Sequence, residues 1–350
     1  MDVGLLFSFR NPVFNRVEWT QTYKAELDLA VAAEGMGYDH VWLSEHHFVD
    51  DGYSPALLPI AAAIAARTTS IRIGTYVLLL PLHNPVRIAE DVATVDVISG
   101  GRFDLGMGLG YRPGEFSGMG VPSSERAARF QEALPFIQRL LAGETASLEG
   151  RFNTFEEVRI TPPPVQQPFP IWVGARGDKA LDRAARLGCH LASIGAIGHR
   201  EKYLDALDRH GRKEADHHVG QLMVCYVAES NEQAWEDCAE PLHHTVREYQ
   251  AWAEESGDQT GDGVAEMAVP SPAEIRAAQG CEIFGRSAMI GDPLTVCEGL
   301  RSYYNETPGS HFVLMMALPG ADPLRTRKSM ALFAEHVMPE LRALPDVEAG

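Results

Sequence analysis

The chain has no long apolar run, few cysteines and too few basic residues to balance its acidic ones. No segment approaches the roughly 18 consecutive apolar residues of a transmembrane helix. The short apolar run at the N-terminus also lacks the preceding basic residues of a signal peptide. The five cysteines are scattered and odd in number, so a disulfide framework is not expected. These absences predict a cytoplasmic protein with reduced thiols.

Negative charge dominates the composition. There are 48 acidic residues against 30 basic ones, which gives a formal net charge of −18 at pH 7. This charge opposes binding to nucleic acids and to anionic membranes, so neither is an expected partner. The apolar fraction of 45% is that of an ordinary globular protein. The expected partners are therefore small molecules.

Short apolar runs alternate with longer amphipathic stretches, which is typical of βα units around a parallel sheet. The expected strands are residues 3–9, 38–44, 71–80, 102–109, 170–175, 189–194, 221–228 and 311–316. The expected helices are residues 18–36, 55–68, 86–98, 123–141, 178–187, 199–209, 232–254, 293–304 and 323–337. Eight fairly even repeats favour a closed barrel over an open doubly wound sheet. The sequence therefore predicts one (β/α)₈-barrel domain over residues 1–350.

Two segments depart from the βα repeat. Residues 146–170 contain five prolines and no helical period, so we expect an inserted hairpin or arm there. Residues 256–292 are rich in glycine, proline and acidic residues. Because long loops inside a compact domain are usually functional or disordered, we interpret this segment as a lid over the active site.

In a barrel, the active site lies at the carboxyl ends of the strands. The second expected strand ends in Glu45, His46 and His47, and an imidazole is suited to a general-base or hydrogen-bonding role. Neighbouring residues of an extended chain point to opposite faces, so the two histidines do not easily bind one ion. The first expected strand, residues 3–9, offers no metal ligand. We therefore predict no metal centre.

Glycines follow the fourth and fifth expected strands. Residues 106–110, GMGLG, do not match the G-x-G-x-x-G dinucleotide fingerprint, but they allow a sharp turn and the close approach of a flat ligand. Residues 174–177 lead into a helix N-terminus, which favours anion binding. Arg126, Arg129 and Arg176 are candidate phosphate partners or simply solvated surface charges. The pairs His217-His218 and His243-His244 are expected at surface or helix positions.

Four segments together resemble the bacterial-luciferase-like flavin enzymes. They are VWLSEHHF at 41–48, the block from IRIGTYVLLL to DLGMGLG at 71–110, PIWVGARG at 170–177 and LFAEHVMPEL at 332–341. The resemblance covers most of residues 1–230 and returns after residue 289. The fold of that family is a (β/α)₈ barrel, in agreement with the strand count.

The resemblance implies site residues. His46 matches the catalytic position beside the flavin C4a atom, and the Tyr76–Val77 bond matches a non-prolyl cis peptide under the isoalloxazine ring. Phe9, Phe48 and Met107 are the expected apolar walls of the substrate pocket. The expected cofactor-binding residues are Glu45, Tyr76, Val77, Gly108, Tyr111, Arg126, Gly174, Ala175, Arg176 and Gly177.

The chain departs from the luciferase pattern where that enzyme binds the flavin phosphate. Leu109 replaces an arginine in the turn after the fourth strand. Arg176 and Gly177 replace a glutamate and a serine in the loop after the fifth strand. Phosphate binding is therefore reorganised, or the flavin differs.

The resemblance implies a two-component monooxygenase. Reduced FMN would come from a separate flavin reductase and react with O₂ to give a C4a-(hydro)peroxyflavin, which oxygenates a small organic substrate. One alternative is an oxidoreductase that uses the deazaflavin F420 on the same barrel. Another is a non-catalytic, flavin-binding relative. We also expect a homodimer, from the resemblance and from the closely spaced Ala61, Ala62, Ala65 and Ala66 of the helix at 55–68.

Overall fold

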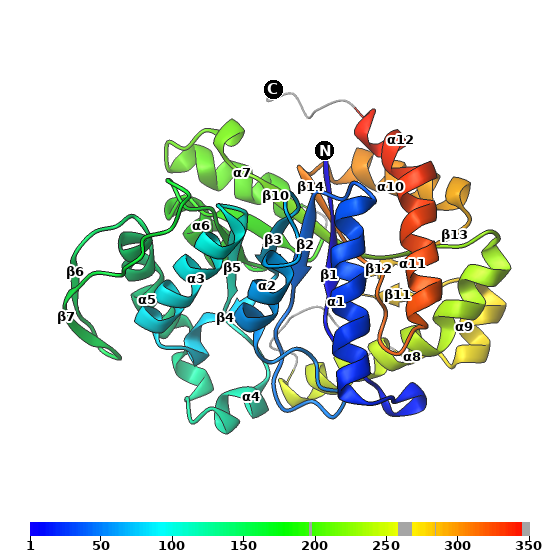
Figure 1. Ribbon diagram of the computed structural model, residues 1–350, viewed down its shortest axis with the longest axis horizontal. Helices are drawn as coiled ribbons and strands as arrows, with labels where there is room; N and C mark the ends of the chain where they lie inside the picture. The colour runs from blue at the N-terminus through cyan, green and yellow to red at the C-terminus, as the bar shows by residue number, and fades with distance from the viewer. Residues whose placement is uncertain (196–197, 258–267, 284, 345–350) are drawn as a thin grey trace.

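The computed structural model describes residues 1–195, 198–257, 268–283 and 285–344, and it forms a closed parallel barrel surrounded by helices (Figure 1). Strand β14 pairs with β1 and with β10, and β9 pairs with β10, so the ring has no open edge. The predicted (β/α)₈ barrel is confirmed. Its strands are β1 (Asp2–Phe7), β2 (His40–Leu43), β3 (Arg72–Thr75), β5 (Phe103–Gly108), β8 (Ile171–Gly174), β9 (His190–Ser193), β10 (Val219–Val227) and β14 (His311–Met315).

Helices follow the strands much as the sequence predicts, with local capping signals at several ends. The side chain of Asn84, for example, accepts hydrogen bonds from the first-turn amides of Val86 and Arg87. Within the described ranges, no helix is long and apolar enough to cross a bilayer. The helices are α1 (Trp19–Gly35), α2 (Leu57–Ala65), α3 (Pro85–Ser99), α4 (Pro113–Gly118), α5 (Arg126–Leu141), α6 (Asp178–Arg186), α7 (His199–Arg209), α8 (Asn231–Glu255), α9 (Pro272–Ala278), α10 (Pro293–Glu306), α11 (Pro323–Leu332) and α12 (Met338–Arg342).

The third strand differs from the single strand expected at 71–80. Strand β3 ends at Thr75, the Tyr76–Val77 peptide is cis, and the short strand β4 (Leu78–Leu79) then pairs with β5. The non-prolyl cis peptide implied by the resemblance is thus present. A run of β-branched and apolar residues does not reveal this interruption.

The two inserted segments have different structures. Residues 146–170 contain an antiparallel hairpin of β6 (Ala146–Glu149) and β7 (Thr154–Val158), which extends from the barrel as expected (Figure 1). In the segment 256–292, residues 258–267 and 284 lie outside the described residues. The remainder forms α9, a two-stranded ribbon of β11 (Glu282–Ile283) and β12 (Arg286–Ser287), and β13 (Met289–Gly291), which pairs with β10. The proposed role of this segment as a lid stays a prediction.

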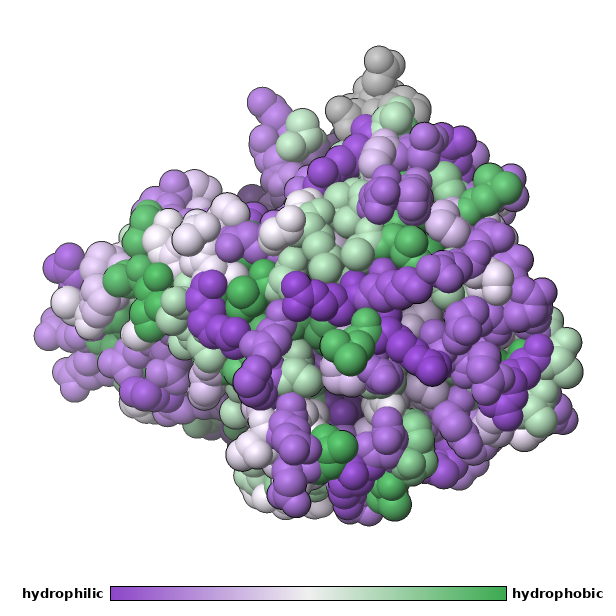
Figure 2. Space-filling view, turned by 45° about the vertical axis from the view of Figure 1, so that its right-hand side comes forward, coloured by the Kyte–Doolittle hydropathy of each residue, from purple (hydrophilic) through white to green (hydrophobic). Residues whose placement is uncertain are grey.

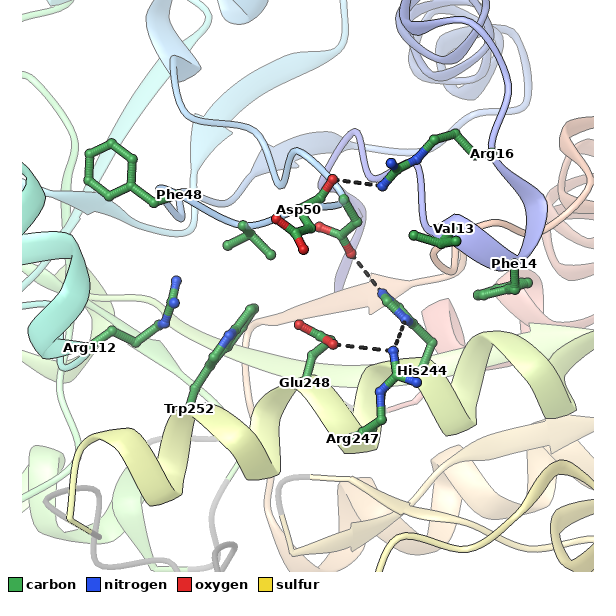
Figure 3. A pocket seen from close by; sticks show the side chains of 12 residues that line it. Val13, Phe14, Arg16, Phe48, Asp50, Arg112, His244, Arg247, Glu248 and Trp252 are labelled. Atoms are coloured by element: carbon green, nitrogen blue, oxygen red, sulfur yellow. Dashed lines mark hydrogen bonds and ion pairs between the residues drawn. The ribbon is translucent and has the colours of Figure 1, made fainter.

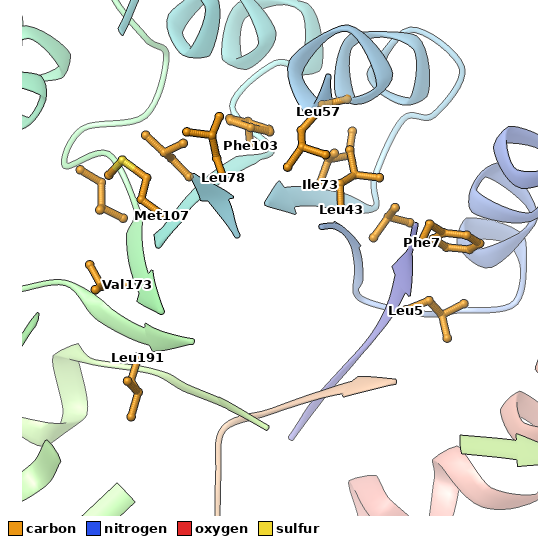
Figure 4. Close-up of a cluster of buried hydrophobic side chains, with 14 of the residues drawn as sticks. Leu5, Phe7, Leu43, Leu57, Ile73, Leu78, Phe103, Met107, Val173 and Leu191 are labelled. Atoms are coloured by element: carbon orange, nitrogen blue, oxygen red, sulfur yellow. The ribbon is translucent and has the colours of Figure 1, made fainter. Parts of the chain in front are cut away.

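The core has two layers because successive side chains of a strand point to opposite faces. Leu5, Phe7, Phe103 and Met107 lie outside the ring of strands, toward the helices (Figure 4). A second cluster, which includes Leu6, Trp42, Trp172, Leu222 and Val313 from the alternate positions, fills the barrel interior. All five cysteines are free and buried.

Histidine and tryptophan rings pack at the amino-terminal end of the barrel. The His40 and Trp42 rings stack with 5.1 Å between their centroids, and the His311 and His218 rings lie 4.9 Å apart. Burial lowers the pKa of His40 well below its ordinary value and lowers that of His218 to about 4. These two rings are therefore neutral at physiological pH.

The close approach of β3 and β5 at Gly106 gives a stability prediction. A Cβ atom on Gly106 would lie 1.9 Å from the carbonyl oxygen of Thr75, whereas one on Gly35 in α1 would have no neighbour within 4 Å. We expect Gly106→Ala to lower the free energy of unfolding by about 2–3 kcal/mol or more. The control Gly35→Ala is expected to raise it slightly, because alanine favours helix more than glycine does. Urea denaturation measures both, and equal stabilities for the two variants would contradict this account.

Candidate active site

A cavity of about 410 Å³ opens at the carboxyl ends of the strands. Its size is typical of small-molecule sites. It is lined by the expected catalytic histidine and by every expected cofactor-binding residue, namely Glu45, His46, Tyr76, Val77, Gly108, Tyr111, Arg126, Gly174, Ala175, Arg176 and Gly177. Segments from four strand ends and α5 thus meet at one place.

His46 is hydrogen-bonded to a fully buried carboxylate. Its Nδ1 lies 2.8 Å from Oε1 of Glu115, which also accepts the backbone amide of His47 at 3.0 Å and lies 3.4 Å from Nη1 of Arg112. Burial raises the pKa of Glu115, but these donors outweigh it and the net pKa is lowered. An ionised carboxylate only accepts hydrogen bonds, so Nδ1 of His46 is the donor in this bond, and in the neutral ring Nε2 carries the lone pair.

Aromatic rings surround His46. Its ring centroid lies 4.7 Å from that of Tyr53, 4.6 Å from Trp252 and 5.8 Å from Tyr111. The hydroxyl of Tyr53 lies 2.8 Å from Ser44 Oγ. These rings hold the imidazole in place and limit the space for water beside it.

Four residues around His46 were not predicted from the sequence, namely Glu115, Tyr53, Tyr249 and Trp252. Tyr249 and Trp252 lie one turn apart near the end of α8, and Tyr249 also lines the cavity. No spacing in the sequence indicates that α8 reaches the end of β2. Glu115 could have been suspected as a site residue, because it follows the glycine-rich segment at 106–110 and lies in the first turn of α4.

Glu45 joins the other histidine of the pair. Its Oε1 lies 2.7 Å from His47 Nε2 and 2.8 Å from His83 Nε2, and its Oε2 accepts the amide of Leu79 at 2.6 Å. Burial raises the pKa of Glu45, but the hydrogen bonds from His47 and His83 outweigh it and bring the pKa to about 2. The His46 ring and the His47 ring thus contact different carboxylates, Glu115 and Glu45.

Two arginines line the cavity, Arg126 at the start of α5 and Arg176 just before α6. No side chain caps the N-terminus of α6, where Gly177 is the N-cap residue. An uncapped helix N-terminus with nearby arginines favours a phosphate group. Arg129, the third candidate, instead pairs with Glu125 at 2.9 Å, away from the cavity lining.

The three expected substrate-pocket residues do not line this cavity, which corrects that prediction. Met107 is fully buried on the helix side of β5, because it shares the face of Leu105. Phe9 follows β1 and is fully buried against α1, where its ring lies 5.1 Å from that of Tyr23. Phe48 is 63% exposed and lines a separate groove of about 520 Å³. Strand alternation alone would have excluded Met107.

That groove lies between the loop at 48–51 and α8, and Trp252 of α8 is one of the residues that line it (Figure 3). Beside it, the buried Asp51 carboxylate accepts Arg10 Nε at 2.6 Å and lies 2.8 Å from His244 Nε2. His244, expected at a surface or helix position, is therefore a buried residue of α8. This network attaches α8 to the first two strand ends, and so it positions Trp252 against His46.

The chain belongs to the luciferase-like monooxygenase family, whose profile matches residues 1–311. The uncharacterized protein y4vJ of Sinorhizobium fredii is 31% identical over 213 residues, which are 58% of this chain and 60% of that protein. The crystal structure of monooxygenase RslO1 from Streptomyces bottropensis is 26% identical with a TM-score of 0.80, covering 97% of this chain and 100% of that one.

Named relatives within the family use different cofactors. The 4-hydroxyprotoasukamycin monooxygenase of Streptomyces nodosus subsp. asukaensis is 28% identical, covering 92% of this chain and 87% of that protein. The oxygenase component of the flavin-dependent trigonelline monooxygenase of Acinetobacter baylyi is 29% identical, covering 65% and 66%. The F420-dependent glucose-6-phosphate dehydrogenase of Nakamurella multipartita is 30% identical, covering 91% and 92%.

The lowered pKa of Glu45 gives a pH prediction. Because its folded pKa of about 2 lies below its ordinary value of 4.5, its contribution to stability is complete above about pH 4.5 and is lost as the pH falls toward 2. We expect Glu45→Gln to lower the free energy of unfolding at pH 7 by on the order of 2–3 kcal/mol. The difference in the free energy of unfolding between Glu45→Gln and the wild type should become smaller as the pH falls from 4.5 to 2.

Urea denaturation at pH 7, 4 and 3 measures that gap. Glu149→Gln, which changes an exposed glutamate of β6, is the control and should differ little from the wild type at every pH. A gap for Glu45→Gln that stays constant with pH would show that the charge of Glu45 does not stabilise the fold.

Proposed function

We propose that the chain is a monooxygenase that uses reduced FMN and O₂ to oxygenate a small organic substrate. The observation that carries this proposal is a single cavity lined by a carboxylate-bound imidazole, His46, by two arginines and by the residues of an uncapped helix N-terminus. Reduced FMN, when bound, supplies the electrons that activate O₂. The protein orients the flavin, excludes water and supplies a proton-transfer group.

Glycines beside the cis peptide support a flat cofactor. A Cβ atom on Gly108 would lie 2.5 Å from the Val77 side chain, and one on Gly174 would lie 3.4 Å from it. The two glycines therefore let Val77 pack closely against these strand ends at the wall of the cavity. Arg126, Arg176 and the N-terminus of α6 would hold the phosphate. In this arrangement Arg176 compensates for Leu109, which cannot bind a phosphate.

His46 is the group that would hold or move a proton. With Nδ1 committed to Glu115, Nε2 is free to accept a proton or a hydrogen bond at the cavity wall. Glu115 is a positioning residue because it acts through His46. The rings of Tyr53 and Trp252 exclude water from this place, which strengthens a hydrogen bond made there.

An F420-dependent oxidoreductase is the second candidate, favoured by the 30% identity to the F420-dependent glucose-6-phosphate dehydrogenase over 91% of this chain. It would transfer a hydride and consume no O₂. Binding of F420 in preference to reduced FMN, without O₂ consumption, would establish this alternative.

We also propose a flavin reductase as the partner that supplies reduced FMN, since one relative is named as an oxygenase component. A homodimer stays a proposal that light scattering tests. The closely spaced alanines of α2 give it little support, because Ala61 and Ala65 are buried in the chain's own core. The face shown in Figure 2 carries apolar residues in small groups among hydrophilic ones.

Replacement of Arg176 tests the phosphate site. We expect Arg176→Ala to weaken binding of reduced FMN by about 10–100-fold, the loss of one charge-assisted hydrogen bond. Binding of reduced riboflavin, which lacks the phosphate, should change little. Anaerobic fluorescence titration with both flavins measures this. Arg129→Ala, which removes an arginine paired with Glu125, is the matched control. Equal losses for FMN and riboflavin would contradict a phosphate role.

Replacement of His46 tests the proton-transfer role. In the wild type mixed with reduced FMN and O₂, we expect H₂O₂ release to lag behind O₂ consumption. His46→Ala should shorten this delay by roughly 10²-fold, the lower range for loss of a general acid–base group. Stopped-flow absorbance with a peroxide assay measures it.

The control for this experiment is His210→Ala, which removes an exposed histidine at the end of α7. Melting temperatures establish that both variants are folded. An unchanged delay in folded His46→Ala would remove His46 from the mechanism, and the absence of any delay in the wild type would contradict the monooxygenase proposal itself.

A further inference from the structure

Three residues converge at the amino-terminal end of the barrel, opposite the flavin cavity. Asp2 on β1, His40 on β2 and His311 on β14 lie on adjacent strands, since β1 pairs with both neighbours. One carboxylate oxygen of Asp2 and one ring nitrogen of each histidine all lie within 4.8 Å of one another. The proposed function uses none of these side chains.

Both ring nitrogens of His311 face polar partners. Nδ1 lies 2.9 Å from Ser310 Oγ, which accepts the amide of Val219 at 2.8 Å. Nε2 lies 3.1 Å from Asp2 Oδ2. A proton on Nε2 can join this nitrogen to the carboxylate, and a metal ion in the same place would replace that proton and bind both atoms.

One ring nitrogen of His40 has no hydrogen-bond partner. Its side chain is 3% exposed, and its Nδ1 is buried with no hydrogen-bond partner. The other nitrogen, Nε2, lies 3.7 Å from Asp104 Oδ2, which already accepts Arg72 Nε at 2.8 Å. A buried polar atom of a native protein that has no partner requires an explanation. A bound cation next to His40 would supply one.

We propose that Asp2, His40 and His311 bind one divalent transition-metal ion of the zinc class. Two imidazole nitrogens and one carboxylate oxygen are donors that zinc prefers. Bonds of about 2.1 Å in a tetrahedral site place ligand atoms roughly 3.4 Å apart, close to the separation of Asp2 Oδ2 and His311 Nε2. The Asp2 side chain is 48% exposed, so an ion can enter from solvent and keep a water ligand.

Ser310 is placed to orient His311 as a metal ligand. Its Oγ lies 2.9 Å from Nδ1, and a hydrogen bond at one ring nitrogen of a ligating histidine leaves the other nitrogen for the ion. The ion would join β1, β2 and β14 at the base of the barrel, and its role would be structural. No metal is predicted from the sequence, because Asp2 lies outside the expected first strand at 3–9 and the three residues lie at the opposite end of the barrel from the strand exits.

Zinc binding to the chain without an affinity tag tests this site. After removal of metal with EDTA and dialysis, titration with ZnCl₂ in a calorimeter should give one saturable site per chain. We expect Asp2→Asn and His311→Gln each to weaken zinc binding by about 100-fold or more, and Ser310→Ala by about 10-fold, the lower range for an outer-shell partner. Both ligand changes lie at the edge of the barrel, so the variants should fold without metal, which circular dichroism verifies.

Two further measurements make the result decisive. Co²⁺ in place of Zn²⁺ should give visible absorption of a four-coordinate site that is lost in His311→Gln. His336→Gln, which removes a half-exposed histidine elsewhere, should bind zinc as the wild type does. The absence of saturable binding would overturn the proposal. So would a loss of binding in His83→Gln with none in Asp2→Asn, because the ion would then occupy the trio Glu45, His47 and His83.

Discussion

A buried carboxylate is stable only where hydrogen-bond donors contact it, and the active-site end of this barrel depends on that requirement at Glu115. Three donors meet its Oε1, whereas its Oε2 is buried and has no partner among the described residues. The donors are the His46 ring and the His47 amide at the end of β2, and Arg112 just before α4, which also lies over the Trp252 ring at 4.7 Å. One buried carboxylate oxygen thus connects the imidazole, the α4 turn and the end of α8.

Two other buried carboxylates act in the same way around this site. Glu45 joins His47 to His83 and to the chain after the cis peptide, and Asp51 joins Arg10 to His244 of α8. Each carboxylate connects segments that follow different strands. Loops at the end of a barrel lack the hydrogen-bonded ladder of the strands, so charge pairs that need desolvated partners give them a defined geometry. The His46 side chain can therefore be oriented before any ligand binds.

The two ends of the barrel differ in the side chains that they carry. The carboxyl ends hold the cavity with its buried carboxylates and arginines, whereas histidines pack on tryptophans at the amino ends. Family membership does not select the cofactor, because one relative is named as flavin-dependent and another as F420-dependent. Leu109 and Arg176, the positions where this chain departs from the luciferase pattern, both line the cavity.

The sequence by itself determined the barrel, because eight buried parallel strands require eight apolar runs. It also located the cavity, because residues at strand ends, such as Glu45 and Gly174, directly follow those runs or end them. It also could have excluded Met107, since alternation along a strand is a local property. Only the tertiary structure decided which distant residues complete the site. Tyr249 and Trp252 reach His46 because the Asp51 network draws α8 over the barrel end. Asp2 and His311 meet because the last strand closes the ring beside the first, and ring closure is a property of the whole chain.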